Sequence, residues 1–346
     1  MVDLPDHMAA AVLKGPGRLD VEDVAVPAVG AGDVLVAVDL CGICGTDLHM
    51  VLDGWGAPGS WQGHEWTGTV ALVGHGVTRW RAGDIVVGGP TTHCGTCSVC
   101  RAGRPSLCAE RATLGIDPEQ GAFASYKLSP ADDLLPVPAS LDPRAAALAE
   151  PLAVALHAVH QSGAQPGQQA LVFGAGPIGA LCIASLRVLG VDSVNCAEPS
   201  AIRQTLAAAV GANKVVHPAD LPVPSIAEPG TVVEGAVDVV LECSGKAPAM
   251  EAGLSQLVRG GTLVLVGADI ESPRFDPNRI LLNELMITGA YTYDHGGFER
   301  ALELLSSGAL PVDALLEPGD VPLDGVLDAM RDLAEGRRAG KVLVRP

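Results

Sequence analysis

Apolar runs and helical patterns alternate regularly through the second half of the chain. The apolar runs have the length and the β-branched content of buried strands. They lie at 169–173, 194–197, 213–217, 237–242, 262–266 and 285–289. Helical patterns separate them, for example at 180–189 and 247–258. Strands that alternate with helices predict a parallel, doubly wound α/β sheet with right-handed crossovers.

The first 150 residues have a different pattern. Short runs such as 34–39, 67–73 and 84–88 alternate between apolar and polar positions, with turn residues between them. This pattern predicts a β-rich domain with a barrel-like sheet. After residue 289 the chain returns to two amphipathic helical patterns and a last strand at 341–345. We therefore expect one domain at 1–151, completed by 293–346, with a second domain at 152–292 inserted into it.

Composition and charge narrow the possible partners. The 346 residues are 48% hydrophobic, which is enough for two separate cores. A net charge of −18 argues against binding to a nucleic-acid backbone, which needs clustered Lys and Arg. No uncharged apolar stretch reaches the roughly 18 residues that span a bilayer, and the N-terminus has no secretory signal pattern. We expect a cytoplasmic protein with neither nucleic-acid nor membrane partners.

Four cysteines close together indicate a metal site. Cys94, Cys97, Cys100 and Cys108 form a Cys-x2-Cys-x2-Cys-x7-Cys run that is broken by glycine and proline. Four thiolates can saturate a tetrahedral zinc ion and leave no position open, which is typical of structural zinc. The alternatives are unrelated or disulfide-bonded cysteines, which suit small secreted domains, and an iron–sulfur cluster, whose common spacings differ.

A glycine-rich turn follows the first strand of the α/β region. The segment Gly174-Ala175-Gly176-Pro177-Ile178-Gly179 lies between that strand and a helical stretch, the order found in dinucleotide-binding domains. Its glycines would let the backbone approach a pyrophosphate at the helix N-terminus. Glu198, 24 residues after Gly174, would accept the ribose hydroxyls and repel a 2′-phosphate, which favours NAD over NADP. Arg203 weakens this preference slightly, because it could stack near the adenine or reach a phosphate. The alternative is a tight turn without a ligand.

Three further segments hold residues suited to a catalytic metal. They are Cys41-Gly-Ile-Cys44-Gly-Thr46-Asp-Leu-His49, then Gly63-His64-Glu65, and Glu150 in Ala-Glu-Pro-Leu. One cysteine, one histidine and one carboxylate would bind zinc with a vacant fourth position, which Lewis-acid catalysis requires.

With these segments in order, the chain resembles the zinc-dependent medium-chain alcohol dehydrogenase family, in its sorbitol, polyol and threonine dehydrogenase branch. The matching segments run from Gly-Ile-Cys-Gly-Thr-Asp-x-His to Gly340-Lys341-Val342 and cover nearly the whole chain. The resemblance implies an α/β protein with a GroES-like, β-rich catalytic domain that binds zinc and a Rossmann domain that binds NAD. It also implies a homo-oligomer, either a tetramer or a dimer.

The resemblance assigns roles at the catalytic zinc. Cys44 and His64 are implied ligands, with Glu65 and Glu150 both within reach of the metal, so that each subunit holds two zinc ions, one catalytic and one structural. Cys41 is implied to be a packed thiol, with a substitute ligand as the alternative. Thr46 is implied to take the proton from the alcohol and to pass it through the nicotinamide ribose to His49, a histidine that can titrate near neutral pH.

The resemblance also implies contacts for the other reactants. Trp55 and Pro90 fall in the substrate pocket, with Trp61 as a further candidate or a core residue. Val266 is expected beside the nicotinamide, and Lys341 either at the cofactor pyrophosphate or exposed at a strand end.

The expected activity is reversible, NAD-linked oxidation of a secondary alcohol, polyol or sugar-like alcohol to the ketone through a zinc alkoxide. One alternative is an activity like that of L-threonine 3-dehydrogenase. Another, of a different class, is a non-catalytic NAD-binding structural or regulatory protein. That protein would be expected to lack the catalytic-site residues, and all of them are present.

Overall fold

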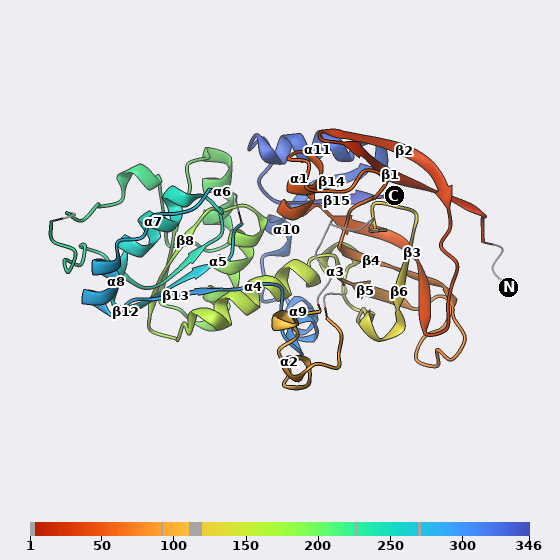
Figure 1. Ribbon diagram of the computed structural model, residues 1–346, viewed down its shortest axis with the longest axis horizontal. Helices are drawn as coiled ribbons and strands as arrows, with labels where there is room; N and C mark the ends of the chain where they lie inside the picture. Colours follow the sequence, from red (N-terminus) through yellow and green to blue (C-terminus); the bar gives the residue numbers. More distant parts are fainter. Residues whose placement is uncertain (1–3, 91–92, 111–119, 226, 269–270) are drawn as a thin grey trace.

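Strands from both ends of the chain form one half of the molecule, and the strands between them form the other half (Figure 1). This computed structural model describes residues 4–90, 93–110, 120–225, 227–268 and 271–346. The two halves lie side by side along the long axis, and helix α4 (Ala149–Ser162) leads from the first half into the second. Within the described residues, none of the helices combines the length and hydrophobicity that a bilayer crossing requires.

The first half is built on a mixed sheet. Its strands lie in the order β14-β15-β3-β4-β5-β7, and β6 pairs with β3. Their bounds are β3 (Asp33–Gly42), β4 (Glu65–Val73), β5 (Ile85–Gly88), β6 (Tyr126–Pro130), β7 (Leu135–Pro136), β14 (Leu316–Pro322) and β15 (Lys341–Arg345), beside the hairpin of β1 (His7–Gly15) and β2 (Arg18–Ala25). Because β15 pairs antiparallel with β3, Leu343 opposite Gly42, the end of the chain completes the first sheet.

The second half has the predicted parallel sheet. Its strands lie in the order β10-β9-β8-β11-β12-β13. From β8 the chain adds strands on one side as far as β10 and then returns to add β11 to β13 on the other side, and this switch between β8 and β11 places a crevice at the carboxyl ends of these strands. The strands are β8 (Gln169–Phe173), β9 (Ser193–Ala197), β10 (Lys214–Val216), β11 (Val237–Glu242), β12 (Leu257–Leu265) and β13 (Met286–Gly289). The prediction of an α/β fold with a GroES-like and a Rossmann domain is confirmed, while the exact domain bounds stay predictions.

The helices cover these sheets and join the two halves. They are α1 (Gly45–Val51), α2 (Ser98–Arg101), α3 (Pro143–Ala146), α5 (Pro177–Leu189), α6 (Ala201–Ala209), α7 (Ala247–Ser255), α8 (Pro277–Asn283), α9 (Gly297–Ser306), α10 (Val312–Leu315) and α11 (Val326–Ala334). Helix α4 is buried along most of its length and shares one core with α5 and α9. The core between the two sheets therefore includes residues from both halves.

One predicted element differs from the structure. The helix expected at 247–258 ends at Ser255, and strand β12 already begins at Leu257. Leu257 is buried opposite Val237 of β11, and Gly260 has a positive φ that no regular helix adopts. Pairing with the neighbouring strand thus decides the conformation of a segment whose apolar residues suit either element.

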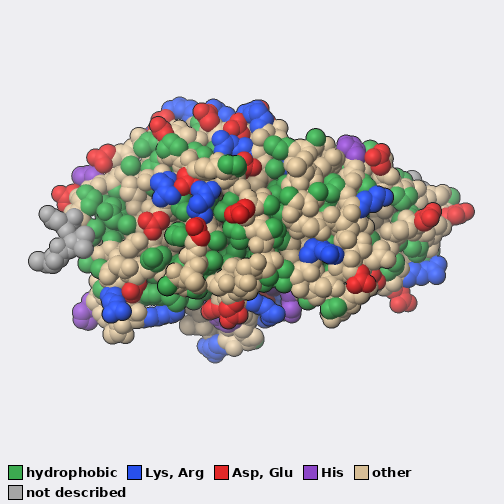
Figure 2. Space-filling model, turned by 180° about the vertical axis from the view of Figure 1, so that it is seen from behind, with side chains coloured by type: hydrophobic (Ala, Val, Ile, Leu, Met, Phe, Trp, Pro, Cys, Tyr) green, Lys and Arg blue, Asp and Glu red, His purple; other side chains and the backbone are tan. Residues whose placement is uncertain are grey.

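One face of the molecule shows how its surface charges are distributed. On the face shown in Figure 2, basic and acidic side chains are interspersed, without a continuous basic tract. A phosphate backbone would need such a tract.

Candidate functional site

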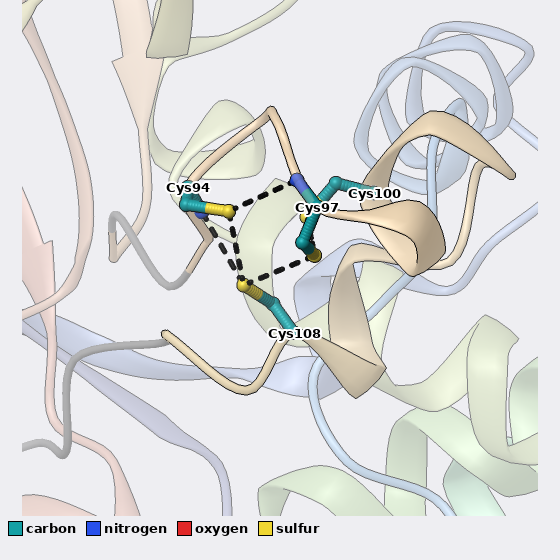
Figure 3. A group of neighbouring side chains, drawn as sticks. All are labelled: Cys94, Cys97, Cys100 and Cys108. Atoms are coloured by element: carbon teal, nitrogen blue, oxygen red, sulfur yellow. Dashed lines mark hydrogen bonds between the residues drawn. The ribbon is translucent and has the colours of Figure 1, made fainter.

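The four clustered cysteines converge as the sequence predicts (Figure 3). Their Sγ atoms all lie within 4.8 Å of one another. Cys97 Sγ is 3.4 Å from Cys100 Sγ, and Cys94 Sγ is 3.6 Å from Cys108 Sγ. All nine cysteines of the chain are free thiols, so the disulfide alternative fails here.

Hydrogen bonds in this lobe support a thiolate at Cys94, whereas burial and the neighbouring thiols raise the pKa of Cys100 to about 12. The amide of Cys97 donates to Cys94 Sγ at 3.4 Å, and that of Cys94 donates to Cys108 Sγ at 3.4 Å. Hydrogen bonds from the backbone and the hydroxyl of Thr96 lower the pKa of Cys94 to about 6. A thiolate, rather than a thiol, is the form that binds zinc. The donor set of four thiolates therefore fits a saturated zinc ion.

A second cluster joins the end of β3 to the start of β4. Cys44 caps the N-terminus of α1, His64 precedes β4 and Glu65 opens it, and their ligand atoms lie within 4.8 Å of one another. Strand pairing places Glu65 opposite Gly42, two residues before Cys44. Gly63 has a φ of 102°, and a Cβ there would lie 2.8 Å from Cys41 Sγ, so glycine alone fits before the histidine.

Asp47 orients this cluster, and it received no role in the sequence analysis. It is fully buried, and its carboxylate accepts the amide of Cys44 at 2.8 Å and that of Gly63 at 3.3 Å. It also lies 3.5 Å from His64 Nδ1, which directs Nε2 toward a metal. Its position as third residue of a helix after a cysteine cap was the available signal in the sequence.

The electrostatics of His64 reflect these neighbours. Burial lowers the pKa of the imidazole, but the charges of Asp47 and Cys44 outweigh burial and raise it well above its ordinary value. The site thus favours a positive charge on His64, and a cation held by the same residues satisfies that preference. The cluster of one thiolate, one imidazole and one carboxylate fits an open zinc site.

Cys41 does not join the ligand cluster. Its side chain is fully buried and contacts the carbonyl of Gly42 at 3.7 Å, and burial raises its pKa well above the ordinary range. It is therefore the packed thiol of the two alternatives, and a role as substitute ligand is not supported.

Neither predicted position of Lys341, at the pyrophosphate or exposed at a strand end, agrees with the structure. Lys341 is 1% exposed, and its Nζ donates to Glu65 Oε1 at 2.7 Å, to Glu65 Oε2 at 2.5 Å and to the carbonyl of Ile43 at 3.0 Å. All three N–H groups are therefore used inside the protein. The cause is the pairing of β15 with β3, which brings the last strand against the catalytic cluster instead of against the glycine turn.

Glu150 approaches the same region from α4. It is 4% exposed, and burial raises the pKa of its carboxyl to about 8. A Cβ built on Gly89 would lie 3.0 Å from Glu150 Cγ and 2.5 Å from Tyr293 Oη, so these two side chains meet over Gly89. Gly89 and His64 line one cavity, which places Glu150 beside the metal cluster although outside its 4.8 Å group.

The proposed relay and pocket residues lie around this cluster. Thr46 Oγ1 is 3.8 Å from Cys44 Sγ. His49 is partly exposed, its Nδ1 is 2.6 Å from Asp53 Oδ2, and its ring stacks on that of Trp55 at 4.7 Å.

The candidate pocket residues lie in different environments. Pro90 lines a cavity of about 120 Å³ together with His64. Trp55 is 41% exposed, whereas Trp61 is buried in a core cluster with Met8. Trp61 is therefore the core residue of its two alternatives, and Trp55 remains available to a ligand.

The glycine turn has the shape that a dinucleotide needs. Gly174 has a φ of 83°, and a Cβ at Gly179 would lie 1.9 Å from the carbonyl of Gly174. A Cβ at Gly176 would meet nothing within 4 Å, so the backbone there is open to a ligand. Pro177 and Ile178 begin helix α5, whose N-terminus faces this opening. The residues present therefore fit the phosphates of a dinucleotide.

The two polar candidates after β9 have different surroundings. Glu198 is 3% exposed and accepts the amides of Ala175 at 2.7 Å and Ser200 at 2.8 Å. These bonds hold the carboxylate beside the glycine turn. Arg203 Nη2 donates to the carbonyl of Leu333 in α11 at 2.8 Å, so Arg203 links the two halves. Its role at the adenine stays a prediction.

The end of β12 and the end of β13 flank the crevice. Val266 follows β12, is partly buried, and donates its amide to the carbonyl of Glu242 at 2.9 Å. Thr292, which the sequence analysis missed, follows β13 with a φ of 49°, and its buried Oγ1 has no hydrogen-bond partner. Backbone strain and an unpaired hydroxyl at the carboxyl edge of a parallel sheet are both typical of ligand sites.

Comparison with known proteins agrees with this geometry. Residues 30–139 match the alcohol dehydrogenase GroES-like domain, and residues 177–307 match the zinc-binding dehydrogenase domain. D-xylulose reductase A of Aspergillus niger is 33% identical over 94% of this chain and 93% of its own length. Sorbitol dehydrogenase of Bacillus subtilis is 31% identical over 99% of this chain and 98% of its own length. A solved Sinorhizobium meliloti structure with NADP bound is 33% identical, with a TM-score of 0.86, and the match covers 99% of this chain and 100% of that one. The chain therefore belongs to the zinc-dependent medium-chain alcohol dehydrogenase family.

Proposed function

We propose that this protein is an NAD-linked dehydrogenase that converts a secondary hydroxyl of a polyol or sugar-like alcohol to the ketone, reversibly. The observation that carries the proposal is the buried cluster of Cys44, His64 and Glu65 beside an open glycine turn. The names of the relatives support the substrate class, since xylulose and sorbitol are a five-carbon ketose and a six-carbon polyol.

In the proposed mechanism, Cys44 and His64 hold the catalytic zinc, with Glu65 and Glu150 nearby. When bound, zinc supplies Lewis-acid polarisation of the substrate oxygen, and NAD supplies the hydride acceptor. The protein contributes orientation. Asp47 fixes the imidazole of His64 through Nδ1, and Lys341 neutralises Glu65, so that the site carries less negative charge than its carboxylates suggest.

The residues around the cluster also provide a path for the proton that leaves the substrate hydroxyl. Thr46, whose hydroxyl contacts Cys44 Sγ, would accept the substrate proton by hydrogen bonding. His49 is partly exposed and could therefore deliver the proton to solvent, and Asp53 Oδ2 at 2.6 Å from its Nδ1 keeps the ring oriented.

The proposed cofactor preference for NAD rests on Glu198. Its carboxylate is held at the end of β9 by two backbone amides, and a second negative charge from a 2′-phosphate would be repelled there. The relative from Sinorhizobium meliloti carries NADP, so the preference has to be tested on this chain. Initial rates with NAD should exceed those with NADP, and Glu198→Gln should narrow the difference. A clear advantage of NADP in the wild type would contradict the assignment.

We further propose two zinc ions per subunit and a cytoplasmic location. Two separate clusters of ligand atoms support the count, and their five free cysteine thiols need a reducing compartment. Metal analysis of the purified protein should give about two zinc atoms per chain. Cys97→Ser and Cys44→Ser should each lower that number toward one.

The proposed oligomer would form through the edge of the Rossmann sheet. Strand β13 ends the described sheet, and large apolar side chains beside it are exposed: Leu281 at 72%, Leu282 at 57% and Met286 at 59%. An unpaired edge with such a patch is suited to pairing with a second copy. Light scattering should show a dimer or tetramer, and Leu281→Asp with Met286→Asp should yield smaller species.

The activity itself is tested with a panel of secondary alcohols, polyols, cyclitols and L-threonine. NAD reduction with polyols, abolished by Cys44→Ser while NAD binding remains, is the expected result. Turnover confined to L-threonine would replace the proposed substrate class, and no turnover with any of them would refute it.

A further inference from the structure

The four-cysteine lobe is fastened to the segment that follows β13. Asp294, in the connection from β13 to α9, lies 2.5 Å from Arg104 Nε and accepts the Ser106 hydroxyl at 2.7 Å and its amide at 3.3 Å. The amide of His295 donates to the carbonyl of Gly103 at 3.3 Å. These contacts join residues almost 190 positions apart in the chain, one side of them in the lobe and the other at the edge of the crevice.

The surroundings of Asp294 make this junction firm. Its side chain is 20% exposed, and His157 Nδ1 of α4 is 4.0 Å from Oδ2, the oxygen that Arg104 also contacts. Burial raises the pKa of the carboxyl, but the hydrogen bonds from Ser106 and Arg104 outweigh burial and lower it. Asp294 is thus an ionised hub between the lobe, α4 and the connection to α9.

The two residues before Asp294 follow the carboxyl end of β13, at the edge of the crevice. Thr292 adopts a left-handed φ of 49°, which is strained for a β-branched residue, and its buried hydroxyl has no partner. The Tyr293 hydroxyl and Glu150 both lie next to Gly89, which lines a cavity together with His64. A strained segment persists only where its surroundings fix it, and the lobe supplies those contacts here.

We propose that Asp294 is a positioning residue through which the four-cysteine lobe holds Thr292 and Tyr293 in the conformation that binds the dinucleotide and substrate. The lobe then serves turnover as well as local folding. The inference rests on the proposed NAD-linked function. It gives the four-cysteine lobe a positioning role, although the zinc of that lobe takes no part in hydride transfer.

The test uses the full-length protein with both zinc ions bound. Dissociation constants for NAD, or for NADP if the wild type prefers it, are measured by titration calorimetry for wild type, Asp294→Asn and Asp294→Ala. We expect the dissociation constant of Asp294→Ala to rise roughly tenfold. This corresponds to the backbone strain at Thr292 that the contacts with the lobe no longer offset. Asp294→Asn keeps an oxygen that can accept from Ser106, so its dissociation constant should lie between those of the wild type and Asp294→Ala. Asp328→Asn, which removes one charge from the exposed pair with Arg331, is the matched control and should change nothing.

A second pair of variants separates positioning from simple stability. Glycine adopts the left-handed region without strain, so in a Thr292→Gly background the loss of Asp294 should weaken binding less than about threefold. The Thr292 hydroxyl is absent both from Thr292→Gly and from Thr292→Gly with Asp294→Ala. Its loss therefore cancels in the ratio of their dissociation constants. Zinc content should stay at about two in every variant.

Several results would overturn the proposal. Equal affinities of wild type and Asp294→Ala would do so, as would the same fold-loss in both backgrounds. Loss of lobe zinc together with affinity would reduce Asp294 to a folding role; if Asp294→Ala does not fold, Asp294→Asn decides. A wild type that bound neither dinucleotide would instead overturn the proposed function itself.

Discussion

Lys341→Met should destabilise the first domain by leaving the Glu65 carboxylate buried without its partner. The two side chains are 1% and 0% exposed, and the ammonium contacts both carboxylate oxygens at 2.7 and 2.5 Å. Methionine keeps most of the volume of the lysine stem while removing the charge. Gly42 packs against the same pair, because a Cβ built there would lie 3.1 Å from Lys341 Cδ.

The expected size follows from this burial. Removing one partner of a buried, hydrogen-bonded ion pair costs about 3–5 kcal/mol, because the remaining charge stays out of water. Replacing both partners by neutral groups costs far less. Glu65→Gln with Lys341→Met should therefore recover most of the lost free energy of unfolding, which gives a coupling of roughly 2–3 kcal/mol.

Urea denaturation of metal-free protein, followed by tryptophan fluorescence, measures this coupling. The chain has four tryptophans, and Trp55, Trp61, Trp66 and Trp80 all lie in the first half, so the signal reports on the domain that holds the pair. Metal-free protein is used because bound zinc would stabilise the variants to different extents.

Two results would refute the reasoning. A Lys341→Met midpoint equal to that of the wild type, with no coupling to Glu65→Gln, would show that the ion pair contributes nothing to stability. Unchanged stability together with a loss of NAD affinity would restore the role at the pyrophosphate that the structure argues against.

Four further predictions concern the metal clusters and the proton path. Cys44→Ser should abolish turnover in a folded protein that still binds NAD; retained activity would contradict the ligand assignment. In metal-free protein, burial raises the pKa of Glu150 from 4.5 to about 8, so the folded state binds more protons than the unfolded state between these values and loses stability as pH rises through this window. The stabilisation by Glu150→Gln, from urea midpoints, should therefore grow by up to a few kcal/mol between pH 5 and 9; a constant difference would argue against it. His49→Ala should slow alcohol oxidation most at low pH, where solvent base is scarce, and an unchanged pH profile would count against the relay. Cys97→Ser should release the lobe zinc to a chelator while the catalytic zinc remains, which metal analysis checks.

Local chemistry in the sequence was enough to identify the four-cysteine cluster, whereas Cys44 and His64 of the second cluster were assigned through the family resemblance. Ligand spacing along a turn is set by short-range backbone geometry, so Cys94 to Cys108 could be grouped before any fold was known. The glycine turn was equally recognisable, because its strand, turn and helix are consecutive in the chain. In both cases the residues that act together are close in sequence.

Positions that depend on strand pairing were harder to predict. Lys341 reaches Glu65 only because β15 pairs with β3, and no local pattern around residue 341 contains that information. The same holds for Asp47, whose task becomes visible once the turn before β4 brings His64 back to the helix that begins at Gly45.

The sequence by itself determined the fold class, the four-cysteine run and the dinucleotide turn, because hydrophobic periodicity and ligand spacing are properties of consecutive residues. The ligands expected in the second cluster came from the family resemblance, because they lie in segments that are separated in the chain. Only the tertiary structure decided that Lys341 neutralises Glu65, that Asp47 orients His64 and that Asp294 joins the four-cysteine lobe to the strained Thr292. Each of these depends on a contact between segments far apart in the chain, and such contacts are fixed by the packing of whole sheets and helices.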